Sequence, residues 1–227
     1  MMRRLWDYYK LHMVVAAFLL YFLGSMVYRA VTYRDVLLYV AAVNITESDK
    51  LTFALRDHFS DYIDMDSAKE KIELYSKLYL TTDVDSENYG YSYASEMKIV
   101  GSIEAKQLDV VLMDKEAFDA FSANGYLMDL HSFLFTNAPS FLQAHDDDIV
   151  KNTVVLEDNA EEVRLDKNVS YEAVTEEVPN GILLSDSAFA KHLGFSAPVY
   201  LGVLQNTEHG EMAAKYVEYL FEDVFEK

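Results

Sequence analysis

The feature that most constrains the fold is an alternation of short apolar segments with amphipathic ones, which begins at residue 35. Asp35–Val43 is a continuous apolar run of strand length, typical of a strand that is buried on both faces. Lys71–Leu80 alternates between an apolar and a wetter face, and Leu108–Asp114 is another short buried strand. Residues at helical spacing follow each of these strands. Such an alternation requires a parallel sheet with right-handed crossovers and helices on its faces.

Helix start signals and apolar stripes predict the connecting helices. Thr46 and Asp49 resemble a helix start, and the stripe that follows is Leu51, Leu55, His58, Phe59 and Tyr62. Thr81–Ser92 is predicted to be a loop, followed by a helix from Tyr93 whose stripe is Met97, Val100 and Ile103. Asp114 is expected to cap the next helix, which ends at Asn124 and Gly125.

The second half of the chain has short strand candidates that are separated by turn residues. These candidates are Val154–Glu157, Glu162–Leu165, Val169–Val178 and Gly181–Ser185. Turn signals at Asp158–Asn159 and Pro179–Gly181 indicate that the strands are antiparallel. The chain is predicted to finish with a helix, a strand and an amphipathic helix, at Asp186–Leu193, Pro198–Leu204 and Met212–Val224.

Composition excludes several classes of function. The chain of 227 residues carries 19 Lys and Arg against 38 Asp and Glu, a formal charge of −19. This charge repels the phosphate backbone, so no nucleic-acid partner is expected. The chain has no Cys, which excludes disulfides, thiolate zinc sites and iron–sulfur ligation. Because the motifs of serine hydrolases, zinc proteases and nucleotide enzymes are absent, we expect no enzyme activity and no cofactor.

The densest metal-like cluster runs from His145 to Asp148. Consecutive carboxylates suit Ca²⁺ or Mg²⁺, but an acidic surface loop or helix start has the same composition. A second acidic run from Asp83 to Glu87 resembles the start of an EF-hand loop, but Asn88 stands where that loop requires Gly. We therefore assign no metal site.

Leu11–Tyr28 is a run of eighteen residues without Asp, Glu, Lys or Arg. As a helix it reaches about 27 Å, close to the hydrocarbon thickness of a bilayer, so it is predicted to be a transmembrane anchor. A cleaved signal peptide and a buried core helix are the alternatives. Leu23 and Tyr28 are too large for a cleavage site, and the basic and aromatic flanks of the run disfavour a core helix.

The charge of the remaining chain orients this anchor. Residues 36–227 contain fourteen Lys and Arg against thirty-six Asp and Glu, a net charge of −22. The anionic inner leaflet repels such a domain, so the N-terminus is predicted to lie inside the cell and the C-terminal domain outside. The expected localisation is the cell membrane, with a single pass and an extracytoplasmic domain.

Three phrases of the sequence carry a resemblance to a known family. They are SEMKIVGSIEAKQLDVVLMDKEAFDAFSANGYLMDL (Ser95–Leu130), VPNGILLSDS (Val178–Ser187) and PVYLGVLQNTEHGEMAAKYVEYLF (Pro198–Phe221). In this order they resemble the type 2 extracellular solute-binding proteins of ABC importers. The resemblance implies an α/β fold, with a three-layer, parallel-core sheet of the periplasmic-binding-protein type. It also implies a small solute and the membrane subunits of an ABC transporter as partners.

Two departures from the family shape the predicted domains. Only about 65 residues lie between Leu130 and Pro198, so the second lobe is expected to be reduced and to span about residues 133–197. The lipidated cysteine that holds most Gram-positive members is missing, and the transmembrane helix takes its place. Residues 1–34 are thus predicted to be a cytoplasmic stub and anchor, and residues 35–227 a solute-binding-like domain.

Open parallel sheets bind ligands at the carboxyl ends of their strands. The polar residues that follow the predicted strands are therefore the candidate ligand-binding residues Asn44, Thr46, Tyr89, Tyr91, Tyr93, Asp114 and Glu116. The three tyrosines suit stacking on a sugar or enclosing a cation, or alternatively they pack the loop against its own domain. The acidic surplus suits a cationic ligand, but it is equally typical of a soluble exported domain.

Two functions from different classes remain open at this point. The first is a membrane-tethered, extracytoplasmic solute-binding-like protein, accessory to an ABC transporter. The second keeps the fold without a ligand, as an interaction or scaffold subunit of a membrane complex. A near-complete second lobe would favour the first function, and the short middle section favours the second.

Overall fold

The computed structural model describes residues 12–26, 33–83, 85–86 and 88–225. Its body is built on one six-stranded sheet in the order β2-β1-β3-β6-β5-β4. The strands are β1 (Asp35–Val43), β2 (Glu70–Leu78), β3 (Val110–Met113), β4 (Ile149–Asp158), β5 (Ala173–Leu183) and β6 (Tyr200–Val203). β1 runs parallel to both β2 and β3, and β6, β5 and β4 form an antiparallel continuation. The fold is therefore a mixed α/β fold, and the predicted parallel pairing of its first three strands is confirmed.

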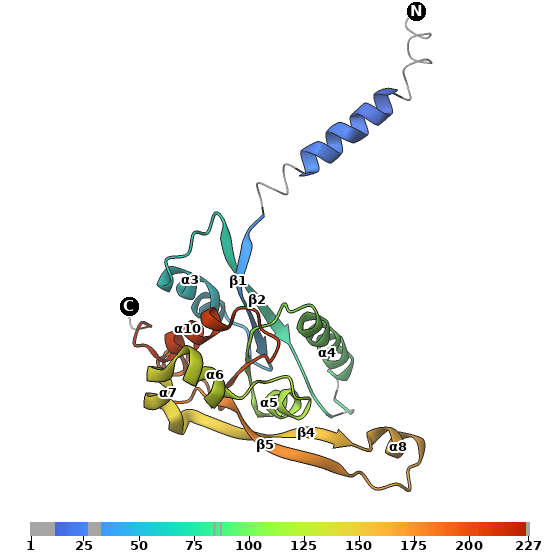
Figure 1. Ribbon diagram of the computed structural model, residues 1–227, viewed down its shortest axis with the longest axis vertical. Coiled ribbons are helices and arrows are strands. Elements are labelled where there is room, and N and C mark those ends of the chain that lie inside the picture. Colours follow the sequence, from blue (N-terminus) through green and yellow to red (C-terminus); the bar gives the residue numbers. More distant parts are fainter. Residues whose placement is uncertain (1–11, 27–32, 84, 87, 226–227) are drawn as a thin grey trace, which may run out of the picture.

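Helices cover both faces of the sheet, as Figure 1 shows. One face carries α2 (Asp49–Thr52), a π-helical stretch (Phe53–Asp57), α3 (His58–Tyr62), α6 (Leu130–Asn137), α7 (Pro139–His145), α9 (Ala188–Leu193) and α10 (Gly210–Phe221). The other face carries α4 (Tyr89–Glu104) and α5 (Lys115–Ala123). A short 3₁₀ turn (Asp146–Asp148) follows α7, and α8 (Ala160–Leu165) lies between β4 and β5.

The alternation of side chains along β1 and β3 explains this layering. Val40 of β1 packs into the core under α10, whereas its neighbour Ala41 packs into the core under α4 and α5. The same holds for Leu112 and Met113 of β3. Because successive residues of a strand point to opposite faces, a strand that is apolar at every position belongs between two layers of helices.

The register of α4 differs from the prediction. The helix begins at Tyr89 rather than Tyr93, and its buried face consists of Ser92, Ser95, Ile99 and Ile103. Met97, which was expected in the core, is 57% exposed. The two serines are buried because their hydroxyls accept backbone hydrogen bonds, from Thr81 N at 2.9 Å and from Tyr79 N at 3.1 Å. A polar residue whose hydrogen bonds are satisfied can occupy a core position that apolar periodicity does not reveal.

Two predictions in the second half are also wrong. Glu162–Leu165, expected to be a strand, belongs to α8. Pro179–Gly181, expected to be a turn, lies inside β5. Pro179 pairs with Lys151 next to a break in the ladder register, where a residue without a backbone N–H is tolerated.

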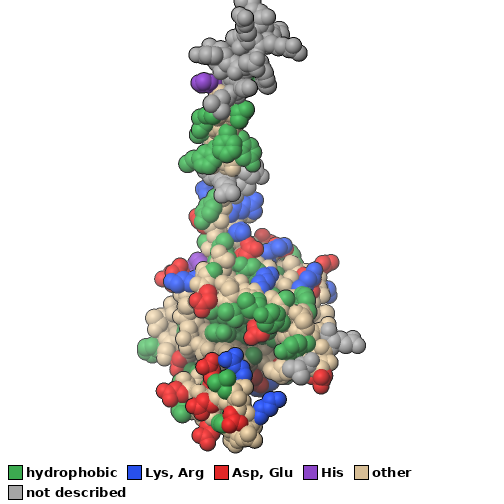
Figure 2. All heavy atoms as spheres, turned by 90° about the vertical axis from the view of Figure 1, so that its right-hand side faces the viewer, with side chains coloured by type: hydrophobic (Ala, Val, Ile, Leu, Met, Phe, Trp, Pro, Cys, Tyr) green, Lys and Arg blue, Asp and Glu red, His purple; other side chains and the backbone are tan. Residues whose placement is uncertain are grey.

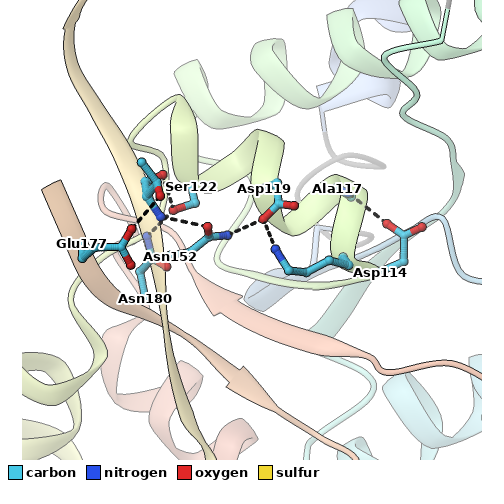
Figure 3. Close-up of polar contacts among 9 residues, drawn as sticks. Asp114, Ala117, Asp119, Ser122, Asn152, Glu177 and Asn180 are labelled. Carbon is cyan, nitrogen blue, oxygen red and sulfur yellow. Dashed lines mark hydrogen bonds and ion pairs between the residues drawn. The ribbon is translucent and has the colours of Figure 1, made fainter. Parts of the chain in front are cut away.

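The region about 133–197, expected to form a reduced second lobe, extends the main sheet. β5 pairs with β6 through Ile182 and Leu183, and beyond these residues it pairs with β4 alone. Residues 151–179 form a two-stranded ribbon with α8 at its end, which we call the arm (Figure 1). Ser122 of α5 holds this arm, because its Oγ donates to Thr153 O at 3.0 Å and accepts from Asn180 Nδ2 at 2.8 Å (Figure 3).

The helix over residues 12–26 stands apart from the body (Figure 1). Its apolar side chains are exposed, with Phe18 at 70%, Leu20 at 71% and Tyr21 at 76%, so it is not a core helix of this body. Among the described residues, no helix has both the length and the apolar character needed to cross a membrane. The predicted anchor Leu11–Tyr28 and its flanks extend into residues 1–11 and 27–32, which lie outside the described residues.

Candidate functional site

The carboxyl ends of β1 and β3 are joined by the side chain of Asn44. Its Oδ1 accepts from Leu80 N at 2.8 Å, and its Nδ2 donates to Leu80 O at 2.8 Å and to Asp114 Oδ1 at 3.1 Å. The backbone of Asn44 has φ +58°, a left-handed conformation that Asn adopts more readily than most residues. Asn44 therefore fixes the chain that leaves β2 against the end of the sheet.

Asp114 is the second predicted ligand-binding residue whose side chain serves the fold. Its Oδ1 accepts from Ala117 N at 2.9 Å, which caps α5 as the sequence predicts (Figure 3). The same oxygen accepts from Asn44. The two residues thus lie together at the sheet edge, as expected for the ends of neighbouring parallel strands, but their polar groups bind each other.

The three predicted tyrosines do not form a common loop surface. Tyr89, Tyr91 and Tyr93 lie in the first turns of α4 and are 44%, 50% and 61% exposed. On a helix, residues four apart share a face and residues two apart do not, so Tyr91 points away from the side that Tyr89 and Tyr93 share. The hydroxyl of Tyr91 donates to Lys77 O.

Thr46 is exposed in the segment between β1 and α2. It does not cap the helix that follows, because Ser48 does so by accepting from Leu51 N at 3.1 Å. Thr46 therefore lies near Asn44 in the chain, but the structure gives it no part in the contacts that gather around Asn44 and Asp114.

Glu116 is held in one orientation by the segment that follows β2. Its Oε1 accepts from Thr82 N at 2.8 Å, from Thr82 Oγ1 at 3.1 Å and from Thr81 Oγ1 at 3.2 Å. All three bonds reach the same carboxylate oxygen. Glu116 thereby links the first turn of α5 to the loop at the carboxyl end of β2.

A pocket of about 120 Å³ lies beside Glu116, between α4, α5 and the segment that follows β2. Its lining residues are Leu80, Thr81, Thr82, Ser92, Glu96, Ile99, Val100, Glu116, Ala120, Phe121, Asn124 and Tyr126. Ile99 and Phe121 are buried and contribute an apolar wall, and Glu96 brings a second carboxylate. The structure therefore combines charged and apolar groups in one hollow at the predicted edge of the sheet.

Of the predicted residues, Glu116 alone lines this pocket. Glu96, Asn124 and Tyr126 were missed by the sequence analysis. Glu96 could have been predicted only from the correct register of α4. In that register it is next to the buried Ser95 and one turn before the buried Ile99, at the edge of the buried face. With that register, the sequence would have indicated a carboxylate at the rim of the helix interface.

The local electrostatics of the pocket are negative. Burial raises the pKa of Tyr126, and the nearby carboxylates of Glu96 and Glu104 raise it further. A negative potential opposes ionisation of a phenol, so Tyr126 stays a neutral hydrogen-bonding group well above neutral pH.

The acidic cluster from His145 to Asp148 has internal contacts, whereas the run from Asp83 to Glu87 lies partly outside the described residues. His145 Nδ1 lies 2.9 Å from Asp148 Oδ2, and its ring stacks on Phe141. In the part of the chain that the structure describes, no group of three or more His, Asp and Glu gathers as a metal site.

No family model matches the chain, and no curated protein matches it. Among solved structures, the chain is similar to the substrate-binding domain of a molybdenum ABC transporter from Clostridium difficile. That likeness has 10% sequence identity and a TM-score of 0.34, and it covers 83% of this chain and 93% of the other.

Proposed function

We propose that this chain is a membrane-tethered, extracytoplasmic solute-binding-like protein that is accessory to an ABC transporter. The observation that carries the proposal is the pocket beside Glu116, at the carboxyl-end loops of the parallel β2-β1-β3 core. Open sheets of this kind bind ligands at that edge. The order of the three family-like phrases along the sequence supports the same function. The proposal assigns no reaction to the chain.

Tethering at the N-terminus suits the position of the pocket. β1 begins at Asp35, so its amino end faces the N-terminal helix and its carboxyl end faces away from it (Figure 1). A bilayer at Leu11–Tyr28 therefore leaves the pocket at the exterior end of the domain. The exposed apolar side chains of residues 12–26 support insertion, because lipid would cover them.

A thermal-shift panel on the full chain in detergent tests solute binding. The panel contains organic amines, amino acids, carboxylates, oligosaccharides and divalent cations. A ligand at a hundredfold over its Kd is expected to stabilise the fold by about 2.7 kcal/mol. Failure of every solute class to raise the melting temperature would overturn the solute-binding function.

A separate experiment tests tethering and orientation. The full chain, with a protease site placed after residue 34, is expressed in cells and the membranes are extracted with alkaline carbonate. The protein is expected to stay in the membrane fraction, and external protease is expected to release residues 35–227 from intact spheroplasts. Release of the uncleaved protein by carbonate, or protection from external protease, would contradict the proposed location.

The arm favours the second function, an interaction or scaffold subunit without a ligand. Its exposed large apolar residues are Leu156 at 56%, Leu165 at 83%, Tyr171 at 56% and Val174 at 58%. The arm carries eight acidic and three basic residues, and Figure 2 shows acidic side chains gathered at the end of the molecule away from the N-terminal helix. A two-stranded ribbon has few contacts of its own, so a partner surface with basic groups would stabilise it.

Site-specific crosslinking separates this function from the first. A photoreactive group at Leu165 is expected to crosslink a transporter membrane subunit in intact membranes, and the same group at Phe135 is the matched control. Phe135 is 74% exposed but lies on α6, away from the arm. Crosslinks from Leu165 without any solute in the thermal panel would favour the scaffold function, and equal crosslinking from both positions would remove the argument for the arm.

A further inference from the structure

We infer that the pocket between α4 and α5 binds a small primary organic ammonium ion, with Glu96 and Glu116 holding the charged nitrogen and Ile99 and Phe121 contacting the carbon chain. This inference rests on the proposed solute-binding function and names the ligand class of the same site. It follows from the charge, the preorganisation, the lining and the size of the pocket.

The carboxylates of the pocket lack a positive partner from this chain. Within the described residues, neither Glu96 nor Glu116 forms an ion pair, and none of the lining residues is a Lys, Arg or His. The lysines on the same helices are engaged elsewhere. Lys98 of α4 lies 4.9 Å from the ring centroid of Tyr75, and Lys115 of α5 pairs with Asp119 (Figure 3). A cation from solution would therefore be the first positive charge in the pocket.

Glu116 is preorganised to accept from such a cation. The donors on Thr81 and Thr82 all bind its Oε1, so within the described structure Oε2 is left to accept from a ligand. These bonds also fix the side chain before the ligand arrives, which reduces the entropy that binding would otherwise cost. Hydrogen bonds from an ammonium to a carboxylate are among the stronger ones in proteins.

The walls of the pocket select an organic cation over a metal ion. The apolar lining residues are Leu80, Ile99, Val100, Ala120 and Phe121. Hard divalent cations require six or more oxygen ligands, which these walls do not supply. An ammonium with a carbon chain suits both the charged and the apolar side of the pocket, because burial of its CH₂ groups away from water is favourable.

The volume limits the size of the ligand. At about 120 Å³ the pocket is smaller than the ~300 Å³ of typical drug-sized ligand sites. A dry cavity of about 150 Å³ holds one benzene molecule, so a chain of roughly four carbons fills this pocket. The −19 charge of the whole protein raises the local concentration of cations and thus their association rate.

Calorimetric titration of the full chain in detergent tests the inference. The probes are n-butylammonium, n-butanol as the neutral analogue of similar size, and butyrate as the anionic one. Butylammonium is expected to bind about tenfold or more tightly than butanol, and butyrate is expected not to bind. Added salt is expected to weaken the binding of butylammonium and to leave that of butanol unchanged. Equal affinity for butylammonium and butanol would overturn the inference.

Two variants and a matched control locate the site. Glu96→Gln and Glu116→Gln are each expected to weaken butylammonium binding about tenfold or more, because each keeps the shape and removes the charge. Glu104→Gln is the control. Glu104 lies on α4, as Glu96 does, and raises the pKa of Tyr126, but it does not line the pocket. Loss of affinity in the control alone, or in none of the three, would contradict the assignment. All variants are first compared by melting temperature.

The solute panel distinguishes the failure of this inference from that of the proposed function. If another solute class raises the melting temperature and Glu116→Gln abolishes the effect, the chain binds a solute but the ammonium inference is wrong. If no solute of any class binds, both are wrong.

Discussion

Asn44 and Asp114, which follow two neighbouring parallel strands, are joined by a hydrogen bond of 3.1 Å from Asn44 Nδ2 to Asp114 Oδ1. Both were candidate ligand-binding residues, because polar groups at this edge of a parallel sheet commonly meet a ligand. Here they meet each other, and Asn44, through its bonds to Leu80, fixes the segment that carries Thr81 and Thr82 to Glu116. Their effect on the pocket is therefore indirect.

This arrangement predicts a difference between two substitutions of Asn44. Asn44→Ala is expected to reduce the free energy of unfolding by about 2–3 kcal/mol, because it removes three hydrogen bonds and places Ala at φ +58°. Asn44→Gly is expected to be less harmful by about 1 kcal/mol, since Gly adopts that φ freely. Urea denaturation measures both, and identical losses would show that the backbone conformation contributes nothing.

Removal of the Asp109 carboxylate, which lies beside His209, is expected to cost more stability than the substitution of Asn44. Asp109 is fully buried, and its carboxylate accepts from Tyr39 N at 2.8 Å and from Thr207 Oγ1 at 2.5 Å, while His209 Nδ1 lies 3.0 Å away. Asp109→Ala is expected to lower the free energy of unfolding by about 3 kcal/mol or more, because several half-buried donors lose their fully buried acceptor.

A matched substitution tests whether burial is the cause. Asp147→Ala removes a carboxylate of the exposed 3₁₀ turn after α7 and is expected to change the stability by less than about 0.5 kcal/mol. Urea denaturation of both variants gives the comparison. Similar effects at Asp109 and Asp147 would refute the role of the buried network.

Gly181 is predicted to tolerate no side chain. A Cβ at this position would overlap Cζ of the buried Phe118 ring, so Gly181→Ala is expected to destabilise the fold by about 1–3 kcal/mol. The control is Gly101→Ala on α4, where a Cβ would meet nothing within 4 Å. That change is expected to stabilise the protein by about 0.5–1 kcal/mol, because Ala favours a helix over Gly. Thermal denaturation of both variants in the same buffer compares them, and a stabilising Gly181→Ala would contradict the packing of Phe118.

The tyrosines around α10 predict a loss of stability at alkaline pH. Burial, followed by the nearby Glu222, raises the pKa of Tyr62 to about 12, and burial raises the pKa of Tyr216 and Tyr219 as well. A phenol whose pKa is higher in the folded state than in the unfolded state contributes its full stability below the unfolded value of about 10. That stability is expected to be lost as the pH rises from about 10 towards 12.

Spectrophotometric titration of tyrosinate checks this window. In the native protein Tyr62, Tyr216 and Tyr219 are expected to ionise later than the exposed tyrosines, and in urea all are expected to ionise together. Tyr62→Phe is expected to reduce the slope of stability against pH between about pH 10 and 12. Ionisation of all tyrosines of the native protein in one step near pH 10 would show that these groups are not buried as described.

Particular elements show how much of the fold could be predicted from the sequence. Asp35–Val43 forms β1 with the predicted bounds, and Asp114 caps α5 as expected, because both depend on local patterns of burial and capping. Gly194 ends α9 with φ +66°, again a local requirement. The register of α4 could not be predicted because buried serines carry no apolar signal. The extended conformation of Pro179–Gly181 could not be predicted because pairing with β4 imposes it on a turn-like sequence.

The sequence by itself determined the elements whose cause lies within a few residues: the buried strands of the parallel core, the caps of α5 and α9, and the acidic character of the chain. The tertiary structure alone decided which polar groups meet. The hydrogen-bond partners of the Asn44 and Asp109 side chains lie between 36 and 100 residues away along the chain, and the pocket requires Glu96 of α4 and Glu116 of α5 to line the same hollow. Apolar periodicity records only whether a side chain is buried, whereas the identity of its neighbours depends on how distant elements pack.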